Sequence, residues 1–75
     1  SALFAGFDGL DDIRTIVPSA ASYLSDSGWL VLEIGADQGS AVGLLFEAAG
    51  FIDVVVRPDL AGHDRIAVGR RPSVR

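Results

Sequence analysis

The short segment formed by residues 58–64 constrains the fold of this chain more than any other feature. It joins two runs rich in β-branched residues, 52–57 and 66–69, which have the composition of strands. Neighbouring parallel strands need a crossover of a dozen or more residues, whereas this segment has only seven. We therefore predict that the two runs form an antiparallel hairpin.

A helix is predicted ahead of these strands. Apolar residues recur at steps of three and four between Leu10 and Leu24, which is the period of one helix face. Asp8 is placed to cap the start of this helix. Pro18 removes one helical hydrogen bond, so we expect a kink or a restart near Val17.

The middle of the chain predicts a strand, a helix and another strand. Residues 29–34 are apolar on both faces apart from Glu33, which is typical of a central strand covered by helices on both sides. A helix is expected over 40–49, where Gly50 suits the position after its C-cap. The strands that flank this helix should be parallel. The predicted order is therefore helix–strand–helix–strand–strand.

Composition limits the class of protein. Seventy-five residues make at most one small domain, and they contain no cysteine and have a net charge of −4. The acidic balance disfavours direct binding to nucleic acid, and no apolar run approaches the ~20 residues of a membrane span. The lack of cysteine fits the cytoplasm, and the N-terminal residues lack the basic region of a secretory signal. Four of the six arginines lie in the last eleven positions, and we expect residues 71–75 to be a frayed tail.

A possible cofactor loop follows the strand at 29–34. Glu33, Gly35 and Gly39 are spaced like the acidic residue and glycines of a loop that binds a nucleotide-like cofactor, and Asp59 lies 20 residues after Gly39, where an acid could hold ribose hydroxyls. Against this, Asp37 stands where such loops have a second glycine. A hairpin, rather than a helix, also follows the next strand. We therefore expect a structural role for this loop.

Several polar residues have both a structural and a functional interpretation. We predict that Glu33 pairs with Arg65, because a lone carboxylate in an apolar strand needs a partner; alternatively, Glu33 lines a substrate pocket at the carboxyl end of the strand. Asp37 is expected to be the N-cap residue or a first-turn acid of the following helix. His63 is expected to be a solvated loop residue. Trp29 is expected in the core.

Two further acids bracket the predicted hairpin loop. Asp59 and Asp64 have short side chains that suit turn hydrogen bonds. Two carboxylates without further oxygen ligands make a poor cation site, so we assign no metal ligand.

Taken together, the segments DGLDDIR, GWLVLEIGADQG and DLAGHDRIAVGRR resemble the C-terminal end of the HemK-type release-factor glutamine methyltransferases. The resemblance implies an α/β fold: the C-terminal portion of a Rossmann-like class I methyltransferase sheet, in which the last strand inserts between the two before it. It also implies S-adenosylmethionine as cofactor and a glutamine side-chain amide of a peptide-chain release factor as substrate. Gln38 would then lie on the substrate side of the sheet.

The signature Asn-Pro-Pro-Tyr and the glycine-rich cofactor loop of that family do not occur in these residues. We therefore assign no catalytic and no cofactor-binding residue, and interpret residues 1–75 as a single partial domain that is inactive alone. Its expected partner is the missing N-terminal half of the domain, or a second copy, along the edge of the strand at 29–34. The alternative is a small α/β structural or interaction module that associates with itself through that edge.

Overall fold

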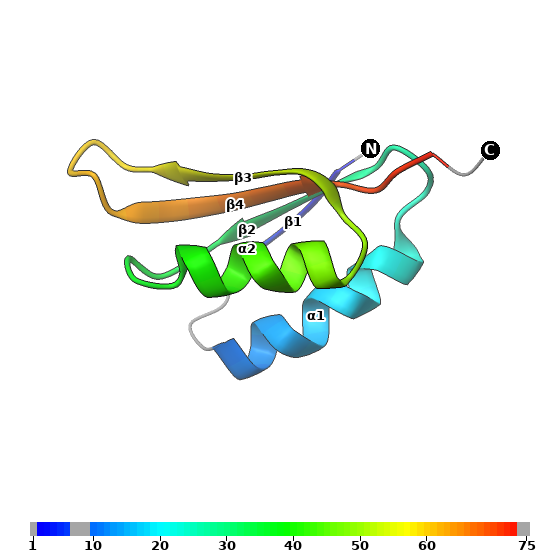
Figure 1. Cartoon of the computed structure of the whole chain (residues 1–75), viewed down its shortest axis with the longest axis horizontal. Coiled ribbons are helices and arrows are strands. Elements are labelled where there is room, and N and C mark those ends of the chain that lie inside the picture. Colours follow the sequence, from blue (N-terminus) through cyan, green and yellow to red (C-terminus); the bar gives the residue numbers. More distant parts are fainter. Residues whose placement is uncertain (1, 7–9, 74–75) are drawn as a thin grey trace.

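The computed structural model describes residues 2–6 and 10–73, with side chains from residue 10 onward. It contains four strands and two helices, and both helices lie against one face of the sheet (Figure 1). In chain order the elements are β1 (Ala2–Gly6), α1 (Leu10–Tyr23), β2 (Trp29–Glu33), α2 (Gly39–Ala48), β3 (Ile52–Pro58) and β4 (Asp64–Arg70).

The strand order confirms the predicted hairpin and its insertion. The sheet has the order β1-β2-β4-β3, and β4 is antiparallel to both of its neighbours. Strands β2 and β3 therefore run in the same direction on either side of β4, as the intervening helix α2 requires. The final strand in sequence occupies an internal position of the sheet.

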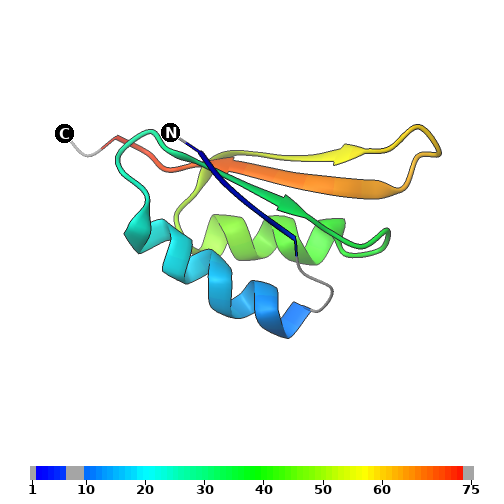
Figure 2. The same cartoon turned by 180° about the vertical axis from the view of Figure 1, so that it is seen from behind.

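Strand β1 was not predicted. It lies beside β2 (Figure 2). The two strands are parallel, with Ala2 opposite Trp29 and Gly6 opposite Glu33. Its sequence, ALFAG, is poor in β-branched residues and has no regular polar alternation, so it carries little strand signal. Because β1 occupies the edge of β2, the predicted association through residues 29–34 is wrong; the two edges of the described sheet belong to β1 and β3.

Helix α1 continues without interruption past Pro18, so the predicted restart near Val17 is wrong. Pro18 is exposed, which lets water reach the helical carbonyl group that loses its hydrogen bond. The opposite face of the helix buries Ile13 and Val17. The predicted cap, Asp8, lies outside the described residues.

Helix α2 ends as predicted at a glycine. Gly50 has φ 93° and donates its N–H to the carbonyl oxygen of Glu47 at 3.0 Å, while Phe51 donates to that of Phe46 at 3.1 Å. These are the two hydrogen bonds of a Schellman motif. The rings of Phe46 and Phe51 pack with centroids 5.3 Å apart. This contact anchors the turn between α2 and β3 on the hydrophobic core.

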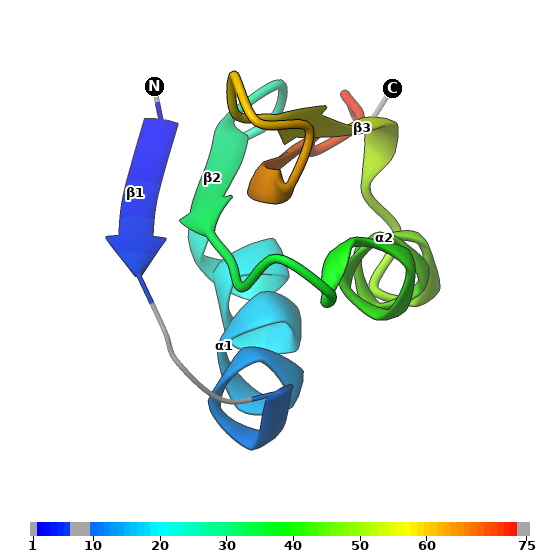
Figure 3. The same ribbon diagram turned by 90° about the vertical axis from the view of Figure 1, so that its left-hand side faces the viewer.

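The core lies between the two helices and one face of the sheet (Figure 3). Leu30 and Leu32 of β2 are fully buried, whereas Trp29, on the opposite face, is 36% exposed. The expectation of helices on both faces is therefore wrong for the described residues, and so is the expected burial of Trp29. Its ring instead lies 5.9 Å from the guanidinium group of Arg70.

The segment after β4 is not frayed over residues 71–73. The N–H of Arg71 donates to the carbonyl oxygen of Gly28 at 2.7 Å, and its own carbonyl oxygen accepts from the N–H of Ser27 at 2.9 Å. The hydroxyl groups of Ser27 and Ser73 lie 2.6 Å apart. Residues 74 and 75 lie outside the described residues. Within the described part of the chain, neither helix is long and apolar enough to cross a membrane.

Candidate functional site

The turn between β2 and α2 is closed by the side chain of Gln38, one of its own residues. The N–H of Gly35 donates to Oε1 of Gln38 at 2.7 Å, and the N–H of Gln38 donates to the carbonyl oxygen of Gly35 at 3.1 Å. Gln38 is also the N-cap residue of α2, so the predicted capping role of Asp37 is wrong; Asp37 is exposed. The Gln38 side chain therefore has a structural role in this turn.

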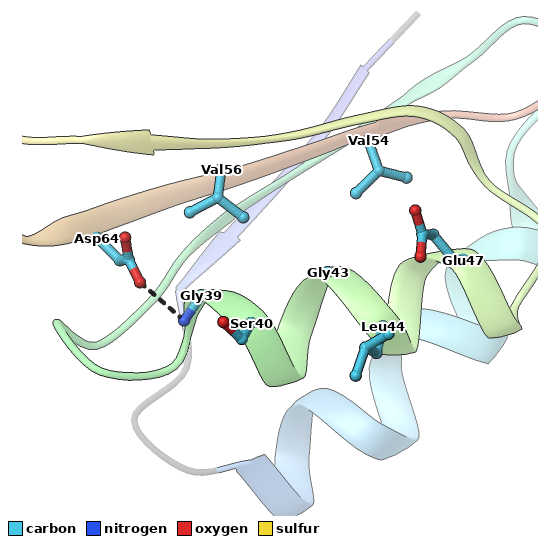
Figure 4. Close-up of a pocket in the computed structure, with 8 residues that line it drawn as sticks. All are labelled: Gly39, Ser40, Gly43, Leu44, Glu47, Val54, Val56 and Asp64. Carbon is cyan, nitrogen blue, oxygen red and sulfur yellow. Dashed lines mark hydrogen bonds between the residues drawn. The ribbon is translucent and has the colours of Figure 1, made fainter.

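Asp64 lies at the N-terminus of α2. Its Oδ2 accepts a hydrogen bond from the N–H of Gly39 at 3.1 Å (Figure 4). A carboxylate at this position satisfies one of the free amide groups of the first turn and favours the positive end of the helix dipole. A side chain at Gly39 would overlap the Asp64 carboxylate, so the close approach requires glycine. Asp64 was expected to serve only the hairpin turn.

A cavity of about 470 Å³ separates α2 from β3. In Figure 4, Val54 and Val56 point from β3 toward the helix, and one carboxylate stands near each end of the cavity, Asp64 at one and Glu47 at the other. The remaining lining residues are Gly39, Ser40, Gly43 and Leu44. Ser40 is the only hydroxyl group in this lining, and no histidine accompanies it. The lining has the character of an apolar cleft and lacks a nucleophile with a base.

The hairpin loop between β3 and β4 is organised by Asp59. Its Oδ1 accepts the N–H groups of Ala61 at 2.9 Å and His63 at 3.0 Å, and its Oδ2 lies 3.5 Å from Nη2 of Arg65. The turn role predicted for Asp59 is confirmed. The side chain of His63 is 64% exposed, in agreement with a solvated loop residue.

The pKa of Asp59 is held below its ordinary value, first by the hydrogen bond from the N–H of His63. Partial burial acts against this, whereas the N–H of Ala61 and the charges of His63 and Arg65 lower the pKa further. A lowered folded-state pKa stabilises the fold above the unfolded-state pKa, and this contribution is lost as the pH falls through the folded-state value.

We expect the Asp59→Asn variant to be less stable than the parent chain near neutral pH. Urea unfolding measured from pH 7 down to pH 2.5 should show the two stabilities converging below about pH 4, where the unfolded chain takes up its proton. Asp12→Asn removes an exposed carboxylate on α1 and is the matched control. A difference between Asp59→Asn and the parent that stays constant over the whole range would contradict the assignment.

The predicted pair between Glu33 and Arg65 does not form. Ile66 lies opposite Glu33, and the N–H of Ile34 donates to the carbonyl oxygen of Arg65 at 2.8 Å, so Arg65 lies opposite Ile34. Neighbouring residues of a strand point to opposite faces, which separates Arg65 from Glu33. Arg65 pairs with Asp59 instead, and Glu33 is exposed at the carboxyl end of β2.

The residues of the β2–α2 turn do not fit an adenosyl cofactor. The N–H of Gly35 is bound by Gln38, and the N–H of Gly39 is bound by a carboxylate, which would repel the carboxylate of S-adenosylmethionine. Among the described side chains, no group of three or more histidine, cysteine, aspartate or glutamate residues is arranged to hold a metal ion.

The hydrogen bond between Asp64 and Gly39 is expected to contribute about 1–2 kcal/mol to stability, as charged hydrogen bonds and helix caps do. Asp64→Ala should lower the free energy of unfolding by that amount in urea denaturation. Asp37→Ala, which removes an exposed carboxylate close to the same helix end, should change it by less than about 0.5 kcal/mol. Equal effects of the two substitutions would show that the carboxylate of Asp64 does not act as a cap.

The fold is that of part of an α/β methyltransferase sheet. The crystal structure of the protein-(glutamine-N5) methyltransferase (release factor-specific) from Alicyclobacillus acidocaldarius superposes with a TM-score of 0.63 over 95% of this chain and 48% of that chain, at 24% sequence identity. No protein-family model matches the chain.

Curated relatives identify the family. The release factor glutamine methyltransferase of Pseudomonas aeruginosa is 56% identical over 93% of this chain, and that of Vibrio cholerae is 43% identical over all of it. The chain belongs to the release factor glutamine methyltransferase family. It spans about a quarter of the length of these relatives, 25% and 26% respectively.

Proposed function

We propose that this chain is the C-terminal part of an S-adenosylmethionine-dependent enzyme that methylates a glutamine side-chain amide of a peptide-chain release factor. The observation that carries the proposal is the 56% identity to the Pseudomonas aeruginosa enzyme over nearly the whole chain. Release factors act on ribosomes, so we place the enzyme in the cytoplasm.

Within that enzyme, the chain supplies part of the sheet, and the rest of the protein supplies the cofactor site. This division is supported by the turn after β2, where Gln38 and Asp64 occupy the amide groups of Gly35 and Gly39. Residues 1–75 are then one partial domain. Alone, they neither bind S-adenosylmethionine tightly nor transfer a methyl group.

Glu33 and Gln38 are the residues that we place on the substrate side of the sheet. Glu33 is exposed at the carboxyl end of β2, where open α/β sheets bind their ligands, and Gln38 lies in the turn that follows. Since the Gln38 side chain also closes this turn, its substitution would disturb the fold, and Glu33 is the better position to test.

A chimera tests the proposed function. The matching quarter of the Pseudomonas aeruginosa enzyme is replaced by this chain, and methylation of release factor is followed by the transfer of labelled methyl groups. We expect the chimera to retain activity within about tenfold of the parent enzyme, and Glu33→Gln in the chimera to lower kcat/KM without shifting its thermal midpoint. A folded chimera that binds S-adenosylmethionine and does not methylate release factor would contradict the proposal.

The isolated chain provides the complementary measurement. Titration calorimetry with S-adenosylmethionine should show no binding in the micromolar range for the 75-residue chain and clear binding for the chimera. Micromolar binding by the isolated chain would show that the turn after β2 holds the cofactor after all.

A further inference from the structure

The outer edge of β3 is an open strand edge at the rim of the described sheet. Strand β3 pairs with β4 on one side only. Two of the six exposed large apolar side chains in the described part of the chain lie on this strand: Ile52 and Val55, with 40% and 42% exposure. Unpaired backbone groups beside exposed apolar side chains are a template for pairing with another strand.

We propose that β3 pairs antiparallel with β3 of a second copy of this chain, with Val55 on the two-fold axis. The sequence IDVVVRP is complementary to itself in this register. In this register Val54 lies opposite Val56 of the second copy, and Asp53, at the irregular start of the strand, comes next to Arg57. Opposite charges that face each other across antiparallel strands stabilise the pair, and a two-fold axis provides each pair twice.

The charges along this edge favour the same partner. Asp53 is bound by Arg70 of its own chain, with Nη2 to Oδ2 at 2.8 Å, and its side chain remains 56% exposed. Arg57 is exposed and forms no ion pair with any described residue. In the dimer, Arg57 of each copy reaches the exposed side of Asp53 in the other, so that this carboxylate lies between two guanidinium groups.

Both ends of β3 limit the length of the edge that can pair. Asp53 has φ 53°, and the pairing with β4 is irregular between Ile52 and Val55, which bends the start of the strand. Pro58 has no N–H to donate at the other end. The regular edge between these points is short, because the regular pairing of β3 with β4 runs only from Val55 to Arg57, so we expect a dimer whose formation depends on concentration.

The cavity between α2 and β3 lies along the same rim. Leu44 is exposed beside it, and Val54 and Val56 point into it from the strand (Figure 4). Pairing of the two β3 strands would bring the two cavities toward each other near the axis. Removal of Val55 from water then adds apolar burial to the backbone hydrogen bonds.

Disulfide trapping tests the register directly, because the chain contains no cysteine. Opposed residues of antiparallel strands have Cβ atoms about 4.5–5.5 Å apart, close to the range that a disulfide bridges. Under mild oxidation, Val55→Cys should form a covalent dimer at least about tenfold faster than Leu60→Cys, although Leu60 is fully exposed. Faster trapping at Leu60 would overturn the proposal, because it would indicate random collision.

Sedimentation analysis tests the charge pairing. Arg57→Asp places like charges opposite each other and should leave a monomer at concentrations where the parent chain is a dimer, whereas Arg57→Lys should remain a dimer. Arg14→Asp changes the net charge equally on α1 and should have no effect; circular dichroism confirms that each variant is folded. A parent chain that stays monomeric up to about 1 mM would overturn the proposal, as would a dimer that Arg57→Asp leaves intact.

Discussion

Truncation of Phe46 to alanine is expected to remove a large part of the stability of the isolated chain at 25 °C. Phe46 is fully buried on α2, and its ring packs against Phe51 at the end of the same helix. Loss of a buried phenylalanine side chain costs about 3–5 kcal/mol, because both burial and packing are lost. A domain of this size has a total stability of roughly 4–11 kcal/mol, so the loss is a large share of the total.

The measurement is urea denaturation followed by far-ultraviolet circular dichroism. Tyr23→Ala provides the control, because Tyr23 is also an aromatic residue on a helix but is 86% exposed. We expect this control to remain within about 0.5 kcal/mol of the parent chain. Equal stability of Phe46→Ala and Tyr23→Ala would show that α2 does not pack on the sheet as described.

The second large loss of stability is expected from a substitution at Gly69 of β4. A methyl group at this position would overlap the ring of Phe46 and lie 3.1 Å from Cβ of Phe51. Since both neighbours are buried in the core, Gly69→Ala should lower the free energy of unfolding by about 1–3 kcal/mol through overpacking. The double variant Gly69→Ala with Phe46→Leu should be less destabilised than the sum of the two single variants.

Gly43→Ala is a matched control for which we expect the opposite change in the free energy of unfolding. A methyl group at Gly43 would meet no atom within 4 Å. Alanine is favoured over glycine inside a helix by up to about 1 kcal/mol, so Gly43→Ala should stabilise the chain. If Gly69→Ala were also stabilising, the close contact between β4 and α2 would be contradicted.

The elements that were predicted correctly depend on local length and local chemistry. The segment at residues 58–64 is too short for a parallel crossover, and this length predicted the hairpin. Gly50 signalled the end of α2 because a left-handed position after a helix favours glycine. The insertion of β4 came from the family resemblance, and the strand order confirms it.

The errors depend on contacts between distant segments. The residues of β1 carry little strand signal, and they become a strand through pairing with β2. The bond between Asp64 and Gly39 joins residues 25 positions apart, and no spacing rule links them. The predicted pair of Glu33 with Arg65 was wrong because Ile66, and not Arg65, lies opposite Glu33. Neighbouring side chains of a strand point to opposite faces, so a difference of one residue in register separates the two charges.

The internal position of β4 has a consequence for synthesis on the ribosome. Strand β3 leaves the exit tunnel before β4, yet β4 is the neighbour that joins β3 to β2. Until β4 emerges, the pair of β1 and β2 is separate from β3, and both have unpaired strand edges. Such edges are prone to association with other chains. Assembly of this sheet must therefore wait for its last-made strand.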